Sequence, residues 1–497
     1  SSELVIVVAS YQDSVKISPL ASYLTVPVLF IKDDADASMV KALRNIGCKR
    51  VLSVGNTKPI SGFKNLLLER DVIDRFFLQI LKEKGESSKY LVVTNPEDIW
   101  KYERKENTLP ITDLSLVSSE LGAYRKAPIL FVSGLDYFNK KYGDGYTQLG
   151  VGLQDNNVKA EKTRELVVNY AVLYQSLGMK LEYLALVGGP VTLPFYYENI
   201  TAYTEERQYT PSDYYFGNTD KDPYQEIAVG RIVARDVSDA SSLLVSTLAF
   251  AEVIKYPYPK DTSSAVYDTV SEDWKENSLM AIGTTKIGPA PGILTPTLVN
   301  QSRTMAEGGF HVTTLGYDAA DANVVKEIID EMNYAVYYGH GNYDCWYSSV
   351  ANPIDADTIS AQNLKPGFAI AMACLTGMID NATIPLQQML SLAFIYSGFT
   401  GYIGANRVAY GLYAPDEKEE VYARGTGALY LADVFSKKVC KEDMDIGKAL
   451  MSAKNALITA QGWDKSTDSG FEAQITVWEY VLYGDPAGNL YVPKFDG

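Results

Sequence analysis

Short apolar runs followed by helical stretches recur along this sequence, and they constrain its fold more than any other feature. Leu4–Ala9, Tyr90–Thr94 and Phe368–Met372 are examples, each apolar at almost every position. Such strands are typical of parallel sheets that are buried on both faces, because a half-exposed strand would alternate apolar and polar residues. The alternation of strands and helices therefore predicts an α/β protein with mostly parallel sheets flanked by helices.

The first half of the chain contains an internal repeat. Ser18–Leu24 leads into Pro27–Ile31, and Ser115–Leu121 leads into Pro128–Val132 in the same manner. An apolar strand precedes each copy, and a helical stretch and a strand ending in glycine follow it. We interpret the pattern as two related α/β units. The alternative is that the two segments look alike only because all doubly wound α/β chains share this pattern. The two glycine-ending strands are Lys49–Gly55 and Glu182–Gly188.

A chain of 497 residues is too long for one hydrophobic core and should form two or three domains. The polar segment Lys255–Ser264 contains two prolines and is the best candidate for a linker. We expect an N-terminal α/β unit over residues 1–85, a first α/β subdomain over 86–275 and a second, catalytic subdomain over 276–497.

The remaining predicted elements follow from apolar periodicity. A helix over 237–254 should be capped by Asp236 or Ser238, because a short polar side chain can accept the first helical N–H groups. In the last region strands alternate with helices, which again predicts a mostly parallel sheet covered on both faces. The strands are expected at 227–229, 278–283, 311–315, 334–338, 368–372 and 400–403, and the helices at 295–307, 323–331 and 386–396.

Composition excludes several classes of function. The net charge of −16 argues against nucleic acid as a partner, because phosphate binding needs a basic face. The sequence contains no run of about 18 uninterrupted apolar residues, so it predicts no transmembrane segment. The four cysteines contain no CxxC pair, which excludes zinc ribbons and thioredoxin-like motifs. A disulfide framework is not expected, although one bridge from Cys48 stays open. With only two histidines, imidazole chemistry must use His311 or His340.

Two strands of the last region end on reactive side chains. Asn333–Gly341 is an apolar strand that ends with His340 between two glycines, and Phe368–Cys374 is an apolar strand that ends on a cysteine. Ligands of parallel α/β sheets bind beyond the carboxyl ends of the strands, so His340 and Cys374 should face one crevice. Cysteine can act as a nucleophile and histidine can transfer its protons. The backbone N–H groups of Gly341 and Cys374 are candidate oxyanion donors. The alternative interpretation is that Cys374 is a buried structural thiol and that His340 is a histidine in a turn.

These two blocks resemble the catalytic blocks of the gingipain-type cysteine peptidases, a family of the caspase-like clan. Trp346 lies a few residues after the histidine, as in that family. Tyr215–Arg231 resembles the signature of the family's first subdomain, and Leu482–Pro486 resembles its characteristic ending. The resemblance implies a caspase-like fold with two side-by-side α/β subdomains and a catalytic dyad of His340 and Cys374. It also implies a secreted or surface-attached protein.

The resemblance implies that the chain is a secreted cysteine endopeptidase, which acts on proteins or peptides through an acyl-enzyme intermediate. No cofactor is required. Calcium is a candidate structural ion, because Asp220 and Asp222 form a short acidic loop whose oxygens suit it. An ordinary solvated turn is the alternative interpretation of that loop.

The substrate preference is harder to predict. Family members that cleave after arginine or lysine hold the basic side chain with an acid, but the corresponding stretch Gly292–Leu298 contains none. We expect the loop Ala405–Asp416 to line the specificity pocket, and Asp416 could supply a charge there. The candidate pocket residues are Tyr410, Tyr413, Trp346 and Asp344.

A second hypothesis is a catalytically inactive peptidase relative that serves as a surface-binding or scaffold protein. The N-terminal unit over residues 1–85 loosely resembles α/β cell-wall-binding modules through its Ser-Pro-Leu-Ala and Pro-Val-Leu-Phe segments. A binding module that carries a peptidase would reconcile the two hypotheses and would give the protein an association with the cell surface.

Overall fold

The N-terminal unit has a parallel sheet of its own in the computed structural model, with the strand order β2-β1-β3-β4. The structure describes residues 3–31, 37–98, 113–132, 153–190, 192–199, 209–250, 273–283, 291–316, 319–349, 351–381, 384–411, 425–464 and 466–496. The elements of the unit are β1 (Leu4–Val8), α1 (Tyr11–Leu24), β2 (Val28–Phe30), α2 (Ala37–Asn45), β3 (Arg50–Val54), β4 (Lys64–Leu68) and α3 (Ile73–Glu83).

The next unit repeats this topology. Its parallel strands have the order β6-β5-β7-β10, which matches β2-β1-β3-β4 strand for strand. The internal repeat read from the sequence is thus also a repeat of strand order. Its elements are β5 (Tyr90–Thr94), α4 (Ser118–Tyr124), β6 (Ile129–Phe131), α6 (Leu153–Ser176), β7 (Tyr183–Val187), β8 (Tyr196–Asn199), β9 (Tyr209–Ser212), α7 (Tyr214–Gly217), β10 (Ala228–Ile232) and α8 (Val237–Ala249).

The first helices of the two units, α1 and α4, pack against each other. A Cβ on Gly122 of α4 would lie only 3.0 Å from Cγ of Pro19, so the helix backbones approach closely. The hydroxyls of Tyr11 and Ser115 form a hydrogen bond of 2.9 Å across the same interface. The N-terminal unit is therefore packed against its neighbour along an interface that small and apolar residues form.

The strands of the second and third regions make one sheet of the order β12-β11-β13-β17-β18-β19-β10-β7-β5-β6. All its neighbours are parallel except β18 and β19, which pair antiparallel, and β19 joins the two regions by lying beside β10. The strands of the third region are β11 (Asn277–Ile282), β12 (His311–Gly316), β13 (Tyr334–Tyr338), β17 (Phe368–Met372), β18 (Gly401–Ala405) and β19 (Tyr480–Gly484).

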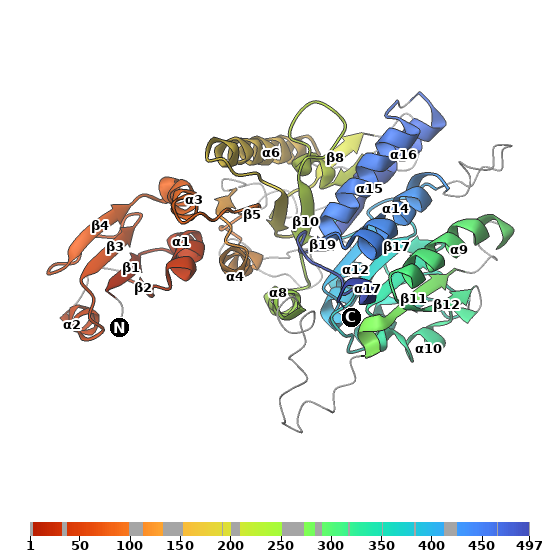
Figure 1. Cartoon of the computed structure of the whole chain (residues 1–497), viewed down its shortest axis with the longest axis horizontal. Helices are drawn as coiled ribbons and strands as arrows, with labels where there is room; N and C mark the ends of the chain where they lie inside the picture. The colour runs from red at the N-terminus through yellow and green to blue at the C-terminus, as the bar shows by residue number, and fades with distance from the viewer. Residues whose placement is uncertain are drawn as a thin grey trace, which may run out of the picture.

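Helices cover both faces of the third region's strands, as Figure 1 shows. On β13, Ala335 and Tyr337 belong to one core and Tyr334, Val336 and Tyr338 to the other, so both faces are buried. The first core includes side chains of α8, α11 (Ala356–Ser360) and α12 (Leu390–Ser397). The second core includes side chains of α9 (Pro291–Glu307), α14 (Gly427–Glu442), α15 (Ile446–Gln461) and α16 (Asp468–Glu479).

Most predicted elements lie where the sequence placed them. The strands at 90–94, 334–338 and 368–372 agree residue for residue, and Asp236 caps α8 by accepting the N–H groups of Ser238 and Asp239. The predicted helix at 323–331 is wrong in length. It divides into α10 (Ala322–Val325) and the 3-10 turn Ile329–Glu331, in a segment where β-branched residues disfavour a long helix.

Other elements were not predicted. They include β4, the antiparallel strand β19, the helices α14 to α16, α17 (Pro493–Asp496), and a small sheet of β14 (Gly341–Asn342), β15 (Cys345–Trp346) and β16 (Ile354–Asp355). The proposed linker at 255–264 lies outside the described residues. Within the described part of the chain, no helix is both long enough and apolar enough to span a bilayer.

Candidate active site

His340 lies immediately beyond the carboxyl end of the buried strand β13. Gly339 precedes it with φ of +157°, and a Cβ at Gly339 would lie 2.5 Å from the hydroxyl of Tyr337. Only glycine fits this turn. The carbonyl of His340 accepts hydrogen bonds from the Tyr337 hydroxyl at 2.7 Å and from the N–H of Tyr347 at 3.0 Å. The backbone that carries the imidazole is thus held by two hydrogen bonds to one carbonyl.

Cys374 lies beyond the carboxyl end of β17, where the buried strand gives way to a turn. It is half-buried, and its Sγ lies 3.8 Å from the carbonyl oxygen of Ala409. The next residue, Leu375, has φ of +64°, an uncommon conformation for a branched side chain. Its N–H donates to the carbonyl of Arg407 at 2.8 Å, which helps to hold the turn in this strained conformation.

The pairing of β13 with β17 aligns the two reactive residues. Tyr338 pairs with Met372, so His340 and Cys374 each lie two residues beyond the last paired position. Gly341 bridges the two turns, because a Cβ added there would lie 2.8 Å from Cβ of Ala373 and 3.0 Å from the carbonyl oxygen of Cys374. The two strand ends are therefore in van der Waals contact at the same edge of the sheet.

The imidazole of His340 has a nitrogen without a hydrogen bond to the described residues. This nitrogen, Nε2, is buried. The other histidine, His311, begins the outer strand β12 and is exposed, with Glu276 3.9 Å from its Nδ1. His340 is thus the only histidine of the chain at the edge that carries Cys374.

The other cysteines are buried in the core. Burial raises the pKa of Cys345 to about 12 and that of Cys440 to about 12, so both stay protonated at neutral pH. None of the four cysteines, all of which lie in described segments, forms a disulfide, so the bridge from Cys48 that the sequence left open is absent.

Trp346 does not line a substrate pocket, which corrects the prediction from the sequence. Its side chain is 0% exposed, stacks on Tyr337 with ring centroids 4.8 Å apart, and donates from Nε1 to the hydroxyl of Tyr402 at 3.1 Å. The residue instead supports the turn that carries His340 from within the core. Its position in the sequence indicated proximity to the histidine and not the direction of the side chain.

Two other pocket candidates lie near the edge of the sheet that carries His340 and Cys374. Asp344 occupies the turn between β14 and β15, and its Oδ1 is buried with no hydrogen bond to the described residues. Tyr410 is half-buried in the segment after β18, and its ring lies 6.0 Å from that of Phe471. Tyr413 and Asp416 lie outside the described residues.

Sequence reasoning missed a buried ion pair beside Cys374. Arg407 donates to both carboxylate oxygens of Asp380, at 2.9 and 2.7 Å, and both side chains are buried. Asp380 also accepts a hydrogen bond from Tyr197 of the first subdomain. The only signal in the sequence was an arginine two residues after an apolar strand, which is too common to single out.

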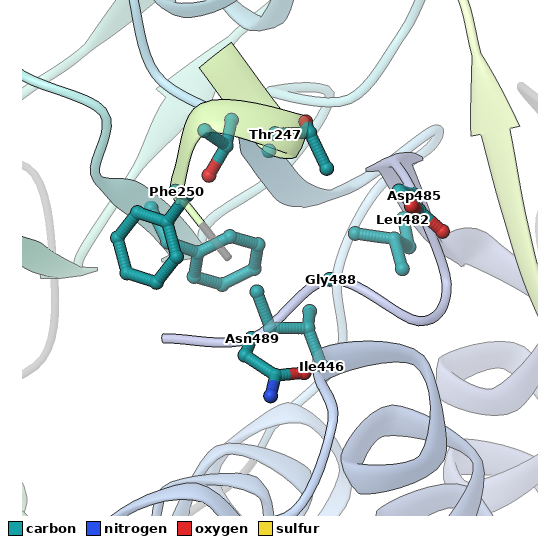
Figure 2. A pocket seen from close by; sticks show the side chains of 10 residues that line it. Thr247, Phe250, Ile446, Leu482, Asp485, Gly488 and Asn489 are labelled. Carbon is teal, nitrogen blue, oxygen red and sulfur yellow. The ribbon is translucent and has the colours of Figure 1, made fainter. Parts of the chain in front are cut away.

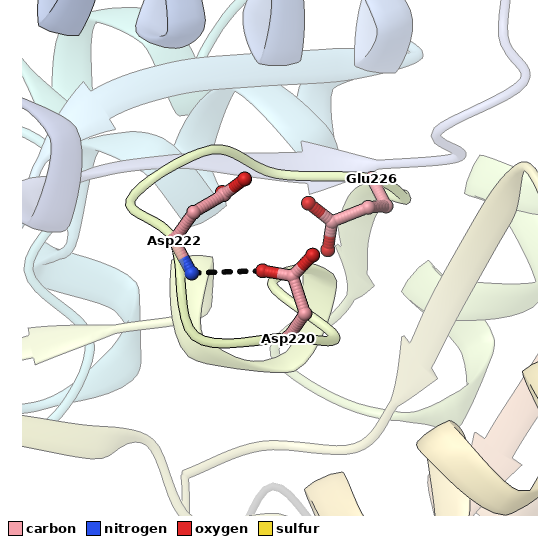
Figure 3. A group of neighbouring side chains, drawn as sticks. All are labelled: Asp220, Asp222 and Glu226. Atoms are coloured by element: carbon pink, nitrogen blue, oxygen red, sulfur yellow. Dashed lines mark hydrogen bonds between the residues drawn. The ribbon is translucent and has the colours of Figure 1, made fainter.

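A third acidic residue, Glu226, lies beside Asp220 and Asp222 of the loop proposed for calcium, as Figure 3 shows. Carboxylate oxygens of Asp220, Asp222 and Glu226 all lie within 4.8 Å of one another. The N–H of Asp222 donates to Asp220 at 2.8 Å, and Thr219 donates to Glu226 from both its N–H and its hydroxyl. Three carboxylates in a turn suit a hard cation. Calcium at this place remains a prediction.

A small cavity on the opposite edge of the sheet is not part of this site. It holds about 10 Å³ and is shown in Figure 2. Phe368 and Gly401, which line it, are the first residues of β17 and β18, whereas Cys374 follows the last residue of β17. Its volume suits one water molecule and is far too small for a peptide side chain.

Comparison with known proteins agrees with this arrangement. A solved structure described as "Structure of Protease" superposes with a TM-score of 0.53 at 15% identity, covering 82% of this chain and 79% of that one. This likeness supports the caspase-like α/β fold. No curated protein matches the chain. The family model of peptidase family C25 matches residues 87–491, which include both His340 and Cys374. The chain therefore belongs to peptidase family C25, the gingipain family.

Proposed function

We propose that this protein is a secreted cysteine endopeptidase in which Cys374 is the nucleophile and His340 transfers the protons. The observation that supports this most is the register of β13 and β17, which sets both residues two positions beyond the same pair. The contact of Gly341 with the carbonyl of Cys374 brings the two turns together. Membership of peptidase family C25, a family of cysteine peptidases, supports the same chemistry.

The reaction proceeds in two halves. Sγ of Cys374 attacks the carbonyl carbon of the scissile peptide bond, and the thiol proton passes to His340. His340 then protonates the leaving amine as the C–N bond breaks, which leaves a thioester on Cys374. In the second half His340 removes a proton from water, which attacks the thioester and releases the acid and the thiol.

The oxyanion that forms in each half needs preorganised donors. In this proposal the backbone N–H groups of Gly341 and Cys374 supply them. Removing one donor of this kind typically lowers the rate by about 10²–10³. The hydrogen bonds to the carbonyl of His340 and the Leu375–Arg407 hydrogen bond fix the two turns, so the donors need no rearrangement during reaction.

Peptide hydrolysis over a mixed-sequence library is the first test, carried out with and without reductant and with and without calcium. We expect cleavage by the full chain and none by Cys374→Ala. Cys345→Ala is the matched control, because this thiol is buried and protonated, and it should retain the activity. The residue preferred before the cut would show whether Asp344, Tyr410 or Tyr413 selects the substrate.

Other results would contradict the proposal. No cleavage under any of these conditions, with no labelling of Cys374 by a thiol-reactive peptide, would support the inactive scaffold instead. Equal losses in Cys374→Ala and Cys345→Ala would point to damage of the fold. A thermal shift by calcium that is lost in Asp222→Asn would support the structural ion, and an equal shift in both proteins would contradict it.

The extracellular location is part of the proposal. It is supported by the resemblance to gingipain-type peptidases, whose members act outside the cell. Surface association would come through the N-terminal unit, which lies before the residues that match the family model. Fractionation of the source cells followed by detection with an antibody tests it, and recovery only from the cytoplasm would contradict it.

A further inference from the structure

The turn that follows Cys374 has a backbone conformation that needs support from its surroundings. Leu375 has φ of +64°, a region that branched side chains rarely adopt. The turn runs on to Asp380, whose side chain is buried. A strained backbone persists only where the structure around it holds it in place, so the contacts of residues 374–380 decide where Cys374 lies.

One residue, Arg407, holds this turn near both of its ends. Its backbone carbonyl accepts the N–H of Leu375 at 2.8 Å. Its guanidinium donates from Nη1 and Nη2 to the two carboxylate oxygens of Asp380, at 2.9 and 2.7 Å. Arg407 is 3% exposed and Asp380 is 1% exposed, so water does not compete for these hydrogen bonds. A bidentate contact of this kind fixes direction as well as distance.

The middle of the turn rests on the neighbouring strands. The N–H of Gly377 donates to the carbonyl of Ala405 at 2.9 Å, and a Cβ on Gly377 would lie 2.6 Å from the carbonyl oxygen of Gly404. The hydroxyl of Tyr483 in β19 lies 2.6 Å from the carbonyl oxygen of Gly377. These contacts hold the centre of the turn, whereas the contacts of Arg407 lie on either side of it.

The Arg407–Asp380 pair also contacts the first subdomain. Nε of Arg407 donates to the carbonyl of Tyr209 in β9 at 3.2 Å, and Tyr197 of β8 donates its hydroxyl to Asp380 at 3.1 Å. Strands β8 and β9 form a separate antiparallel pair outside the large sheet. This strand pair thus supplies hydrogen bonds to both members of the ion pair, so the first subdomain helps to hold a turn of the second.

Resting on the peptidase function proposed above, we propose that Arg407 is a positioning residue that, with Asp380, holds the turn 374–380 for catalysis. It sets Sγ and the backbone N–H of Cys374 where the scissile carbonyl must meet them, and it acts only through the turn. A buried ion pair contributes little net stability, because lost hydration offsets the attraction between the charges, whereas its directional hydrogen bonds fix geometry. The strands β8 and β9 complete the arrangement from the first subdomain.

The test compares two buried ion pairs of the same chemistry in the full chain. Arg407→Lys keeps the charge but loses the bidentate contact. For a peptide that the library experiment selects, we expect kcat to fall about 100-fold with KM within about threefold of the wild type. Arg231→Lys is the matched control, because Arg231 is 0% exposed on β10 and donates to both carboxylate oxygens of Asp213. It should lower the melting temperature to a similar degree and leave kcat within about threefold.

Two reagents separate the position of Cys374 from the integrity of the fold. Iodoacetamide alkylates the thiolate without forming an oxyanion, so its rate with Arg407→Lys should stay within about threefold of the wild type. A peptide aldehyde adds the thiol across its carbonyl, and the resulting oxygen accepts from the same backbone N–H as the oxyanion of the substrate. The aldehyde should therefore bind about 100-fold more weakly to Arg407→Lys.

Tyr197→Phe provides a second variant should Arg407→Lys fail to fold. It removes the hydroxyl that donates to Asp380 and should lower kcat about fivefold at an unchanged KM. The proposal is overturned if kcat stays at the wild-type value in those of the two variants that fold, if Arg231→Lys loses as much kcat as Arg407→Lys, or if both reagents weaken equally. A wild-type chain that neither cleaves peptides nor binds the aldehyde would instead overturn the peptidase function itself.

Discussion

At the scale of single residues, the two glycines around His340 have different physical roles. Gly339 is required by its backbone conformation, since φ of +157° excludes other residues. Gly341 is required by the space around it, because Thr376, Ala373 and the carbonyl of Cys374 leave no room for a side chain. The sequence shows two glycines, and only the structure shows that Gly339 combines a positive φ with a close neighbour, whereas Gly341 has close neighbours alone.

Gly341→Ala should lower kcat/KM by about 100-fold, because a shift of about 1 Å between the two turns can have an effect of that size. The added Cβ would lie 2.6 Å from Cγ2 of Thr376, so one turn must move. Steady-state kinetics and a thermal melt measure the two effects separately. Gly316→Ala is the control, since nothing lies within 4 Å of its added Cβ, and unchanged kinetics in Gly341→Ala would contradict this packing argument.

Asp98 predicts a dependence of stability on pH. Burial raises the pKa of Asp98 to about 6, even though Ser115 donates two hydrogen bonds to it. The unfolded carboxyl ionises near pH 4, so the stabilisation is complete below that pH and is lost as the pH rises through 6. The loss should be about 3 kcal/mol. Denaturant unfolding at pH 4 to 7 should show this loss of stability in the wild type and not in Asp98→Asn. An equal pH dependence of the unfolding free energy in both proteins would contradict the prediction.

At the scale of elements, the active edge depends on where strands and helices end. Strands β13 and β17 end at the same level, and His340 and Cys374 each lie two residues beyond the last paired position. Helix α16 ends at Glu479 and passes directly into β19, which places a buried acid behind the segment that follows β18. Apolar periodicity locates the strands, but the helix α16 and the direction of β19 were not predicted from it.

The cap of α8 offers a test at this scale. Asp236 accepts hydrogen bonds from the N–H groups of Ser238 and Asp239, at 2.8 and 3.1 Å. Asp236→Ala leaves these donors without that acceptor and should lower the free energy of unfolding by about 1 kcal/mol. Asp236→Ser should recover most of it, and Ser238→Ala should have little effect. Chemical denaturation measures all three, and a neutral Asp236→Ala would argue against the cap.

At the scale of the whole molecule, a buried ion pair inside the N-terminal unit also contacts the neighbouring unit. Lys16 of α1 contacts Asp74 of α3, which also accepts the hydroxyl of Tyr170 from α6. The ammonium group further donates to the carbonyl of Ile129 in β6 at 2.5 Å. The unit over residues 1–85 therefore shares a polar core contact with the peptidase region, in addition to the packing of α1 on α4.

Asp74→Ala should destabilise the chain strongly, because it leaves the ammonium of Lys16 buried without its counter-ion. Losses of about 3–5 kcal/mol are typical of such changes. The exposed pair of Lys49 and Glu3 is the control, and Glu3→Ala should leave the free energy of unfolding almost unchanged. Denaturant unfolding would measure both, and equal small effects would show that the buried pair does not fasten the unit.

The sequence by itself determined the fold class, the repeat and the positions of His340 and Cys374 just beyond two strands. Buried parallel strands require continuous apolar runs, so Tyr334–Tyr338 and Phe368–Met372 were visible as strands, and His340 and Cys374 as their ends. Local chemistry also limited the cap of α8 to Asp236 or Ser238, because the capping interaction spans only three residues, and the structure has Asp236. These features depend on neighbours in the chain.

Only the tertiary structure decided which side chains face the site. Trp346 is near His340 in sequence yet is buried under it, whereas Arg407 and Glu479 are distant from Cys374 in sequence yet lie at or behind the same edge. The join of the two subdomains through β19 is likewise set by long-range pairing. Apolar periodicity fixes whether a residue is buried, but the register between distant strands fixes what it is buried against.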